Sequence, residues 1–154
     1  MMSLFVRLAD WQTDREAIRG IRQKVFVEEQ NVPEDLEWDE HEESAQHFLV
    51  YHHNKPIGTG RLTGGGKIGR MAILKDARGL GAGLELLNRI CKFARVSGQK
   101  NVYLNAQVQA IPFYEKAGFA VTGEEFMEAD IPHVRMDLTL SEKEPCENAD
   151  DCNR

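Results

Sequence analysis

A glycine-rich turn, Arg78-Gly79-Leu80-Gly81-Ala82-Gly83, stands between a short apolar run and an amphipathic segment. Glycines let the backbone turn tightly, and no Cβ then blocks the approach of a ligand. The first turn of the following helix offers unpaired N–H groups and the positive end of the helix dipole, which suit a phosphate. Arg78 adds a permanent, forked cation. This pattern indicates a site for a phosphorylated cofactor.

Spacing argues against two common phosphate-binding motifs. A dinucleotide fingerprint reads G-x-G-x-x-G and has an acidic residue about 20 positions further on, whereas the corresponding residues here, Gln99-Lys100-Asn101, hold no carboxylate. A nucleotide P-loop needs Gly-Lys followed by Ser or Thr, which is absent. The remaining pattern, Arg-x-x-Gly-x-Gly, resembles the pyrophosphate-binding motif of the GNAT acetyltransferase superfamily, whose members use acetyl-CoA. On these residues alone, a turn that serves only chain geometry is equally acceptable.

A second motif follows one helix and one strand later, over residues 105–119. GNAT enzymes commonly carry Asn-x-x-Ala-x-x-Phe/Leu-Tyr-x-x-x-Gly-Phe in this place. Gln107 stands where that asparagine usually is. The matching residues are Ala110, Phe113, Tyr114, Gly118 and Phe119. Two motifs in the right order and at the right separation favour acetyltransferase architecture over chance.

The N-terminal half extends the resemblance to the ElaA-like and YjcF-like bacterial branch of the superfamily. The similar residues are Arg22-x-x-Val25-Phe26-Val27-x-Glu29-Gln30-x-Val32-Pro33, Glu37-x-Asp39, Leu104-Asn105-Ala106-Gln107 and Ile131-Pro132-His133. The likeness spans roughly residues 6–138. It implies an α/β fold of three layers, the GNAT acyl-CoA N-acyltransferase fold. In that fold, strands four and five of a mixed central sheet splay into a V that holds the pantetheine arm.

The chain of 154 residues fits one domain, expected over 1–140, followed by an acidic and disordered tail over 141–154. A net charge of −6 argues against nucleic acid as a partner. No apolar run approaches the ~18 residues of a membrane span, and no signal peptide is apparent, so we expect a cytoplasmic protein without membrane contact. Cys146 and Cys152 in the tail match no common zinc spacing, and no metal is expected.

Hydrophobic periodicity and turn residues predict the elements. Thr13 and Glu16 have the spacing of a capping box for the first helix. A long acidic loop is expected over 31–45. Strands are predicted at 3–8, 47–53, 57–63, 67–74, 102–107, 119–122 and 133–140, and helices at 14–28, 84–96 and from Pro112 to Gly118.

The resemblance implies how acetyl-CoA would be held. Its pyrophosphate would rest on the N–H groups of the glycine loop, and its pantetheine would pair with the backbone of the preceding strand, with a donor near Ile73 for the thioester oxygen. The residues expected to contact the cofactor are Met71, Ala72, Ile73, Arg78, Gly79, Leu80, Gly81, Ala82, Gly83, Asn105, Gln107 and Phe113.

Acetyl transfer to an amine also needs a base and an acid. Tyr114 matches the residue that serves as general acid in many GNAT enzymes; alternatively it only packs the cofactor. Glu29, at the end of the first helix, is the first candidate for the base, and His133 and Asp39 are weaker ones. A solvated carboxylate at a helix end is the alternative for Glu29.

The acceptor is left open by the sequence. Nine acids and no Lys or Arg lie between residues 25 and 46, which would attract a cationic amine, whereas Arg22 or Arg61 could bind a carboxylate or phosphate on it. Residues expected at the acceptor are Arg22, Phe26, Asp39, Arg61 and His133. A small amine, an amino sugar, an amino acid, a protein lysine or an N-terminus all fit, as do a monomer and a homodimer. The competing functions are a non-catalytic acyl-CoA sensor or scaffold, and a nucleotide- or phosphate-binding domain.

Overall fold

The computed structural model describes residues 4–31, 42 and 44–140. The predicted tail and Asp39 lie outside these residues. The first half contains β1 (Leu4–Ala9), α1 (Trp11–Arg22), the π-helix η1 (Gln23–Glu29), β2 (Gln46–His52), β3 (Lys55–Leu62) and β4 (Ile68–Ile73). The second half contains η2 (Lys75–Ala77), α3 (Ala82–Val96), β5 (Asn101–Gln107), η3 (Val108–Ala110), α4 (Ile111–Lys116), β6 (Ala120–Val121), β7 (Phe126–Glu128) and β8 (Ile131–Thr139).

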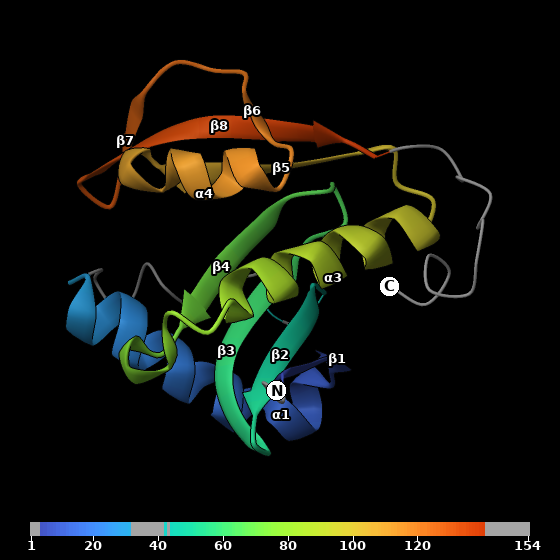
Figure 1. The fold of residues 1–154 in the computed structure, drawn as a ribbon, viewed down its shortest axis with the longest axis vertical. Helices are drawn as coiled ribbons and strands as arrows, with labels where there is room; N and C mark the ends of the chain where they lie inside the picture. The colour runs from blue at the N-terminus through green and yellow to red at the C-terminus, as the bar shows by residue number, and fades with distance from the viewer. Residues whose placement is uncertain (1–3, 32–41, 43, 141–154) are drawn as a thin grey trace.

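The strands form two antiparallel sheets, which confirms the predicted α/β fold class but divides the expected mixed sheet in two. One sheet has the order β1-β2-β3-β4, and the other has the order β5-β8-β6 with β7 also paired to β8. Among the described residues, one isolated parallel bridge, Lys67 with Tyr103, joins the two sheets. Beyond that bridge β4 and β5 run apart, and the V that the resemblance implies lies between them (Figure 1).

One hydrophobic core cluster connects the two sheets through helix α3. The buried face of α3, which includes Leu86 and Ile90, shares this cluster with Val50 of the first sheet and with Val102 and Met136 of the second. Burying one apolar stripe of a helix against two sheets at once removes most of its hydrophobic surface from water. Helix α3 therefore holds together two sheets that share almost no backbone hydrogen bonds (Figure 1).

Helix α1 begins earlier than predicted, and its cap is a different pair of residues. Asp10 accepts a hydrogen bond from the N–H of Gln12 at 2.9 Å, and the N–H of Asp10 donates to Asp14 at 2.8 Å. The capping box predicted from Thr13 and Glu16 is therefore wrong, because the Asp10–Asp14 pair already satisfies the orphan donors of the first turn.

The end of the predicted first helix is wound as the π-helix η1. Its closing N–H, from Gln30, donates to the carbonyl of Val25 at 3.1 Å, five residues back. A π-turn rotates the following side chains relative to an α-helix, and such turns are frequent at functional sites. Here the change brings Phe26 and Gln30 to the side of the molecule where the sheets separate.

The sequence missed the hairpin between β7 and β8. Ala129 and Asp130 form its two-residue turn, with φ of 49° and 62°. Both residues lie in the left-handed region, which is the geometry of a type I′ turn. No Asn-Gly or Asp-Gly pair marks this turn, so the sequence provided little signal for β7 or for the start of β8 at Ile131.

A buried ionic cluster ties α1 to β3. Both terminal guanidinium nitrogens of Arg22, a residue 0% exposed, donate to the carboxylate of Glu42 at 2.9 and 2.7 Å. Arg61 reaches the same carboxylate at 3.2 Å, and His47 Nε2 donates to the Glu42 carbonyl at 2.6 Å. Hydrogen bonds of this kind offset the free-energy cost of removing the charged groups from water.

We expect Glu42→Gln to lower the free energy of unfolding by about 3–5 kcal/mol, because it leaves two buried guanidinium groups without their shared carboxylate. Urea unfolding followed by circular dichroism measures this change. The matched control is Glu124→Gln at an exposed position, for which a change within about 0.5 kcal/mol is expected. Equal losses in the two variants would contradict a stabilising role for the cluster.

Candidate functional site

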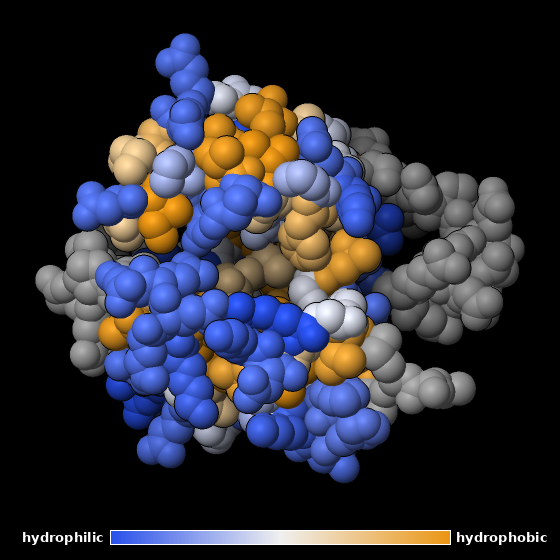
Figure 2. Space-filling view, turned by 60° about the vertical axis from the view of Figure 1, so that its left-hand side comes forward, coloured by the Kyte–Doolittle hydropathy of each residue, from blue (hydrophilic) through white to orange (hydrophobic). Residues whose placement is uncertain are grey.

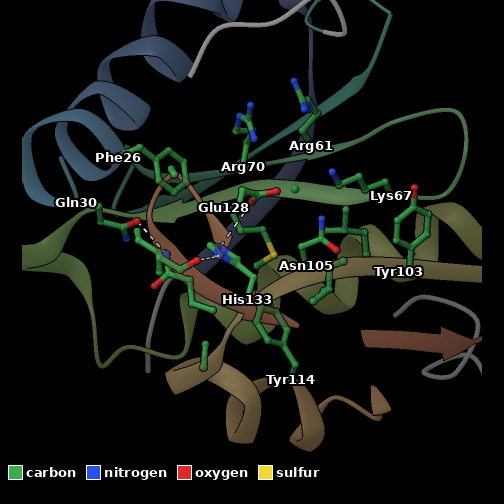
Figure 3. Close-up of a pocket in the computed structure, with 18 of the residues that line it drawn as sticks. Phe26, Gln30, Arg61, Lys67, Arg70, Tyr103, Asn105, Tyr114, Glu128 and His133 are labelled. Atoms are coloured by element: carbon green, nitrogen blue, oxygen red, sulfur yellow. Dashed lines mark hydrogen bonds and ion pairs between the residues drawn. The ribbon is translucent and has the colours of Figure 1, made fainter. Parts of the chain in front are cut away.

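A cavity of about 900 Å³ lies where β4 and β5 separate. Figure 2 shows the molecule hollowed between its two halves, with hydrophobic residues on the floor and hydrophilic residues along one rim. Side chains from η1, β3, β4, β5, α4 and the β7–β8 hairpin line the cavity (Figure 3). The predicted site residues that it brings together are Phe26, Arg61, Met71, Asn105, Gln107, Tyr114 and His133.

Strand β4 contains a bulge beside the cavity. Thr59 pairs with Ala72 and Arg61 pairs with Gly69, so β4 has one residue more than β3 over this stretch. Arg70 lies in the bulge with φ of 51°. Bulges bend a strand and interrupt its pairing. This bulge bends β4 near the point where the strand leaves β5. The sequence did not predict the bulge, because an arginine rarely adopts positive φ.

The free edge of β4 presents backbone groups to the gap. The N–H of Leu74 donates to the carbonyl of Ile57 in β3 at 2.8 Å. Because backbone groups of successive residues alternate in direction along an antiparallel strand, those of Ile73 point away from β3. The Ile73 carbonyl accepts from Arg78 Nε at 3.0 Å, and its N–H faces the space between the strands.

The glycine loop has the backbone geometry that its residues predicted. Gly79 and Gly81 have φ of 89° and 82°, and Gly81 is the N-cap of α3. A side chain at either position would be strained, because L-residues rarely adopt this region. Gly83 has no such φ, and a Cβ there would lie 3.4 Å from the ring of Phe113, which is ordinary contact.

Arg78 is bound to Glu29. Its two terminal nitrogens donate to the two carboxylate oxygens of Glu29, each at 2.7 Å. These hydrogen bonds lower the pKa of Glu29 below its ordinary value, because they stabilise the charged form. Glu29 also lines a separate cavity of about 720 Å³ beside η2 and not the one that holds Tyr114. This placement argues against Glu29 as the base.

His133 has the geometry of a base. Its Nδ1 lies 2.6 Å from the carbonyl oxygen of Ile131, and a carbonyl only accepts, so Nδ1 carries the proton and the neutral ring keeps its lone pair on Nε2. Nε2 lies 3.6 Å from a carboxylate oxygen of Glu128. The ring stacks on Phe126 and is 6% exposed. Figure 3 shows it in the middle of the cavity, above Tyr114.

Tyr114 lies on α4, edge-on to Phe113 and to Phe119. Burial raises the pKa of its phenol, because the phenolate would lose its hydration there. Gln107 lies nearby and donates to Gln30 at 3.0 Å, so the ends of β5 and η1 are connected across the gap.

The acceptor residues that the sequence predicted lie in different places. Arg22 is fully buried against Glu42 and lines neither cavity, which argues against contact with an acceptor. Arg61 lines the cavity while bound to Glu42. Phe26 lines it from η1. The sequence reasoning missed several lining residues, which are Gln30, Lys67, Arg70, Tyr103 and Glu128.

Within the described ranges, no helix is long and apolar enough to cross a membrane. The same ranges contain no group of three or more His, Cys, Asp or Glu side chains arranged to hold a metal ion.

Comparison with known proteins agrees with this geometry. The family model for an acetyltransferase (GNAT) domain matches residues 11–140. The uncharacterized N-acetyltransferase YjcF of Bacillus subtilis is 44% identical over 120 residues, which cover 75% of this chain and 86% of the relative. An acyl-CoA N-acyltransferase from Pseudomonas aeruginosa superposes with a TM-score of 0.78 at 27% identity, over 90% of this chain and 100% of that one. Escherichia coli ElaA superposes with a TM-score of 0.78 at 25% identity, over 90% and 99%.

We expect Gly81→Ala to lower the free energy of unfolding by about 1–2 kcal/mol, because it forces a Cβ into the left-handed region. Gly83→Ala is the matched control within the same loop. It lies in the first turn of α3 at an ordinary φ, so alanine there should leave stability unchanged or raise it by up to ~1 kcal/mol. Chemical denaturation measures both variants. Equal destabilisation of the two would contradict the assigned loop geometry.

Proposed function

The chain belongs to the GNAT acetyltransferase family, and we propose that it transfers the acetyl group of acetyl-CoA to a primary amine by direct attack in a ternary complex. The observation that carries this proposal is the cavity between β4 and β5, which Met71, Tyr114 and His133 line together. Holding the thioester and the amine side by side there makes the attack effectively unimolecular.

Acetyl-CoA would lie along the gap between the strands. Its pyrophosphate would accept hydrogen bonds from the N–H groups of Gly79–Gly83, at the positive end of α3. Its pantetheine would pair with the edge of β4 as an added strand. The Ile73 N–H would then donate to the thioester oxygen and stabilise the negative charge that develops on it.

Tyr114 would protonate the departing thiolate. When the amine nitrogen has bonded to the carbonyl carbon and the C–S bond breaks, the sulfur needs a proton. Burial raises the pKa of the Tyr114 phenol, so it stays protonated at neutral pH. Burial acts on thiols in the same direction, as Cys91 shows with a pKa raised to about 12. A desolvated CoA thiolate would likewise be a stronger base than in water, which offsets the weaker acidity of the buried phenol.

His133 would take the proton that the amine loses. Its Nδ1–H is held by Ile131, so Nε2 is the accepting atom. Glu128 lies close enough to balance the charge of the imidazolium that forms. Glu29 fits this role less well because its carboxylate is bound to Arg78.

We predict that Tyr114→Phe lowers turnover roughly 100-fold or more and changes acetyl-CoA affinity little. Phenylalanine keeps the ring and deletes only the proton donor, so the loss should fall on the chemical step. Release of free CoA thiol with a panel of primary amines measures turnover, and calorimetry measures affinity. Wild-type protein that binds acetyl-CoA but acetylates no amine would support a sensor instead. Equal turnover in wild type and Tyr114→Phe would leave Tyr114 a packing residue.

The base is tested by comparing His133→Gln with Glu29→Gln. We expect His133→Gln to lower the rate at neutral pH roughly 100-fold, and the deficit should shrink as the pH rises toward the ~10 at which an alkylamine deprotonates unaided. Glu29→Gln should leave the shape of the pH–rate profile unchanged. The reverse pattern, with acetyl-CoA affinity intact in both variants, would restore Glu29 as the base.

A further inference from the structure

Three polar side chains line the cavity near the point where the two sheets meet. They are the ammonium of Lys67, the hydroxyl of Tyr103 and the amide of Asn105. The backbones of Lys67 and Tyr103 form the bridge between the sheets, and the N–H of Tyr103 donates to the carbonyl of Gly66 at 2.9 Å. In the described part of the chain, these three polar groups have no hydrogen bond or ion pair with another side chain. Figure 3 shows Lys67 and Tyr103 together on one side of the cavity.

The proposed base, His133, lies on β8 beside the far end of β5. Gln107 pairs with His133 in the register of β5 and β8. Tyr103, Asn105 and Gln107 are partly buried at alternate positions of β5, and alternate side chains of a strand share a face. The four residue steps from Tyr103 to Gln107 span roughly 13 Å of strand. The cavity therefore has a hydrogen-bond-donating region around Lys67 and a separate proton-accepting region at His133 and Glu128.

The described part of the cavity lining carries more cations than acids, and most of the predicted acidic loop (32–41 and 43) lies outside the described residues. Among the described residues that line the cavity, the cations are Arg61, Lys67 and Arg70, and Glu128 is the acid. Arg61 already contacts Glu42, whereas the Lys67 ammonium is directed into the cavity beside two neutral groups that can donate hydrogen bonds (Figure 3). An ammonium with neighbouring donors matches the acceptor-rich oxygens of a carboxylate or a phosphate.

We propose that the acceptor is a primary amine joined through several bonds to an anionic group, a carboxylate or a phosphate. Lys67, Tyr103 and Asn105 bind the anion, and the amine lies beside Nε2 of His133. The separation along β5 is the reason that the two groups must be several bonds apart. This inference rests on the proposed function, because it assigns the second substrate of the same cavity.

Matched pairs of amines test the proposal. One pair is 6-aminohexanoate and hexylamine, and the other is 5-aminopentyl phosphate and 5-aminopentanol. Each pair differs in the anionic group, and thiol release from acetyl-CoA gives kcat/KM for every amine. We expect wild type to prefer the anionic member of at least one pair roughly tenfold or more. The pair with the larger preference identifies carboxylate or phosphate as the bound group.

Substitutions then locate the anion. Lys67→Gln should abolish the preference, whereas Lys67→Arg keeps the charge and should retain most of it. Lys116→Gln, at an exposed position of α4 outside the cavity, is the matched control and should leave the ratio unchanged. Because the readout is a ratio of two amines on the same protein, a general loss of activity or stability cancels.

Each outcome decides between the proposals. Neutral amines that react as well as anionic ones would overturn the anionic acceptor and leave the acetyltransferase proposal standing. A preference that survives in Lys67→Gln would overturn the anion site assigned to Lys67, Tyr103 and Asn105. Acetyl-CoA binding without thiol release for any of the four amines would count against the proposed function itself, and the inference would fall with it.

Discussion

The separation of β4 from β5 is the constraint on which the rest of this structure depends. Neighbouring strands of a sheet normally pair by backbone hydrogen bonds. An unpaired strand edge inside a protein costs free energy, because its N–H and C=O groups lose their hydrogen bonds to water. Here one bridge, Lys67 with Tyr103, joins two sheets, and the strands then diverge. The apolar face of α3 supplies the cohesion that the missing hydrogen bonds do not, because its buried residues pack on both sheets. The gap can therefore remain open to an extended ligand without dividing the core.

Arginines connect the elements around this gap. Arg22 and Arg61 share the carboxylate of Glu42 and attach α1 to β3. Arg78 contacts Glu29 in η1 and the carbonyl of Ile73 at the end of β4. The first cluster is buried and is expected to contribute strongly to rigidity. The second is about one-third or more exposed on both side chains, where an ion pair contributes little to stability.

Burial raises the pKa of two acidic side chains of this protein, with different chemical consequences. It raises the pKa of Tyr114, so the phenol stays protonated and neutral at neutral pH. It raises the pKa of Cys91 and makes that thiol a poor nucleophile, since the thiolate is the reactive form. His133 is also buried and lines the cavity, and its Nδ1 has a carbonyl partner, so this hydrogen bond orients the ring.

Local patterns along the chain were sufficient to predict the fold class, the glycine loop before α3 and the family, because each depends on neighbouring residues. Gly79 and Gly81 determine their own backbone geometry, and the motif that contains Tyr114 spans a few residues. The tertiary structure decided the partners. Glu29 meets Arg78 across 49 residues, Arg22 is buried by Glu42, and Lys67 and Tyr103 come together at a bridge between two sheets. Such contacts depend on how α3 and the sheets pack, and no periodicity or spacing in the sequence records that. The same limit explains why the first candidate for the base was a residue whose charge is bound elsewhere in the folded protein.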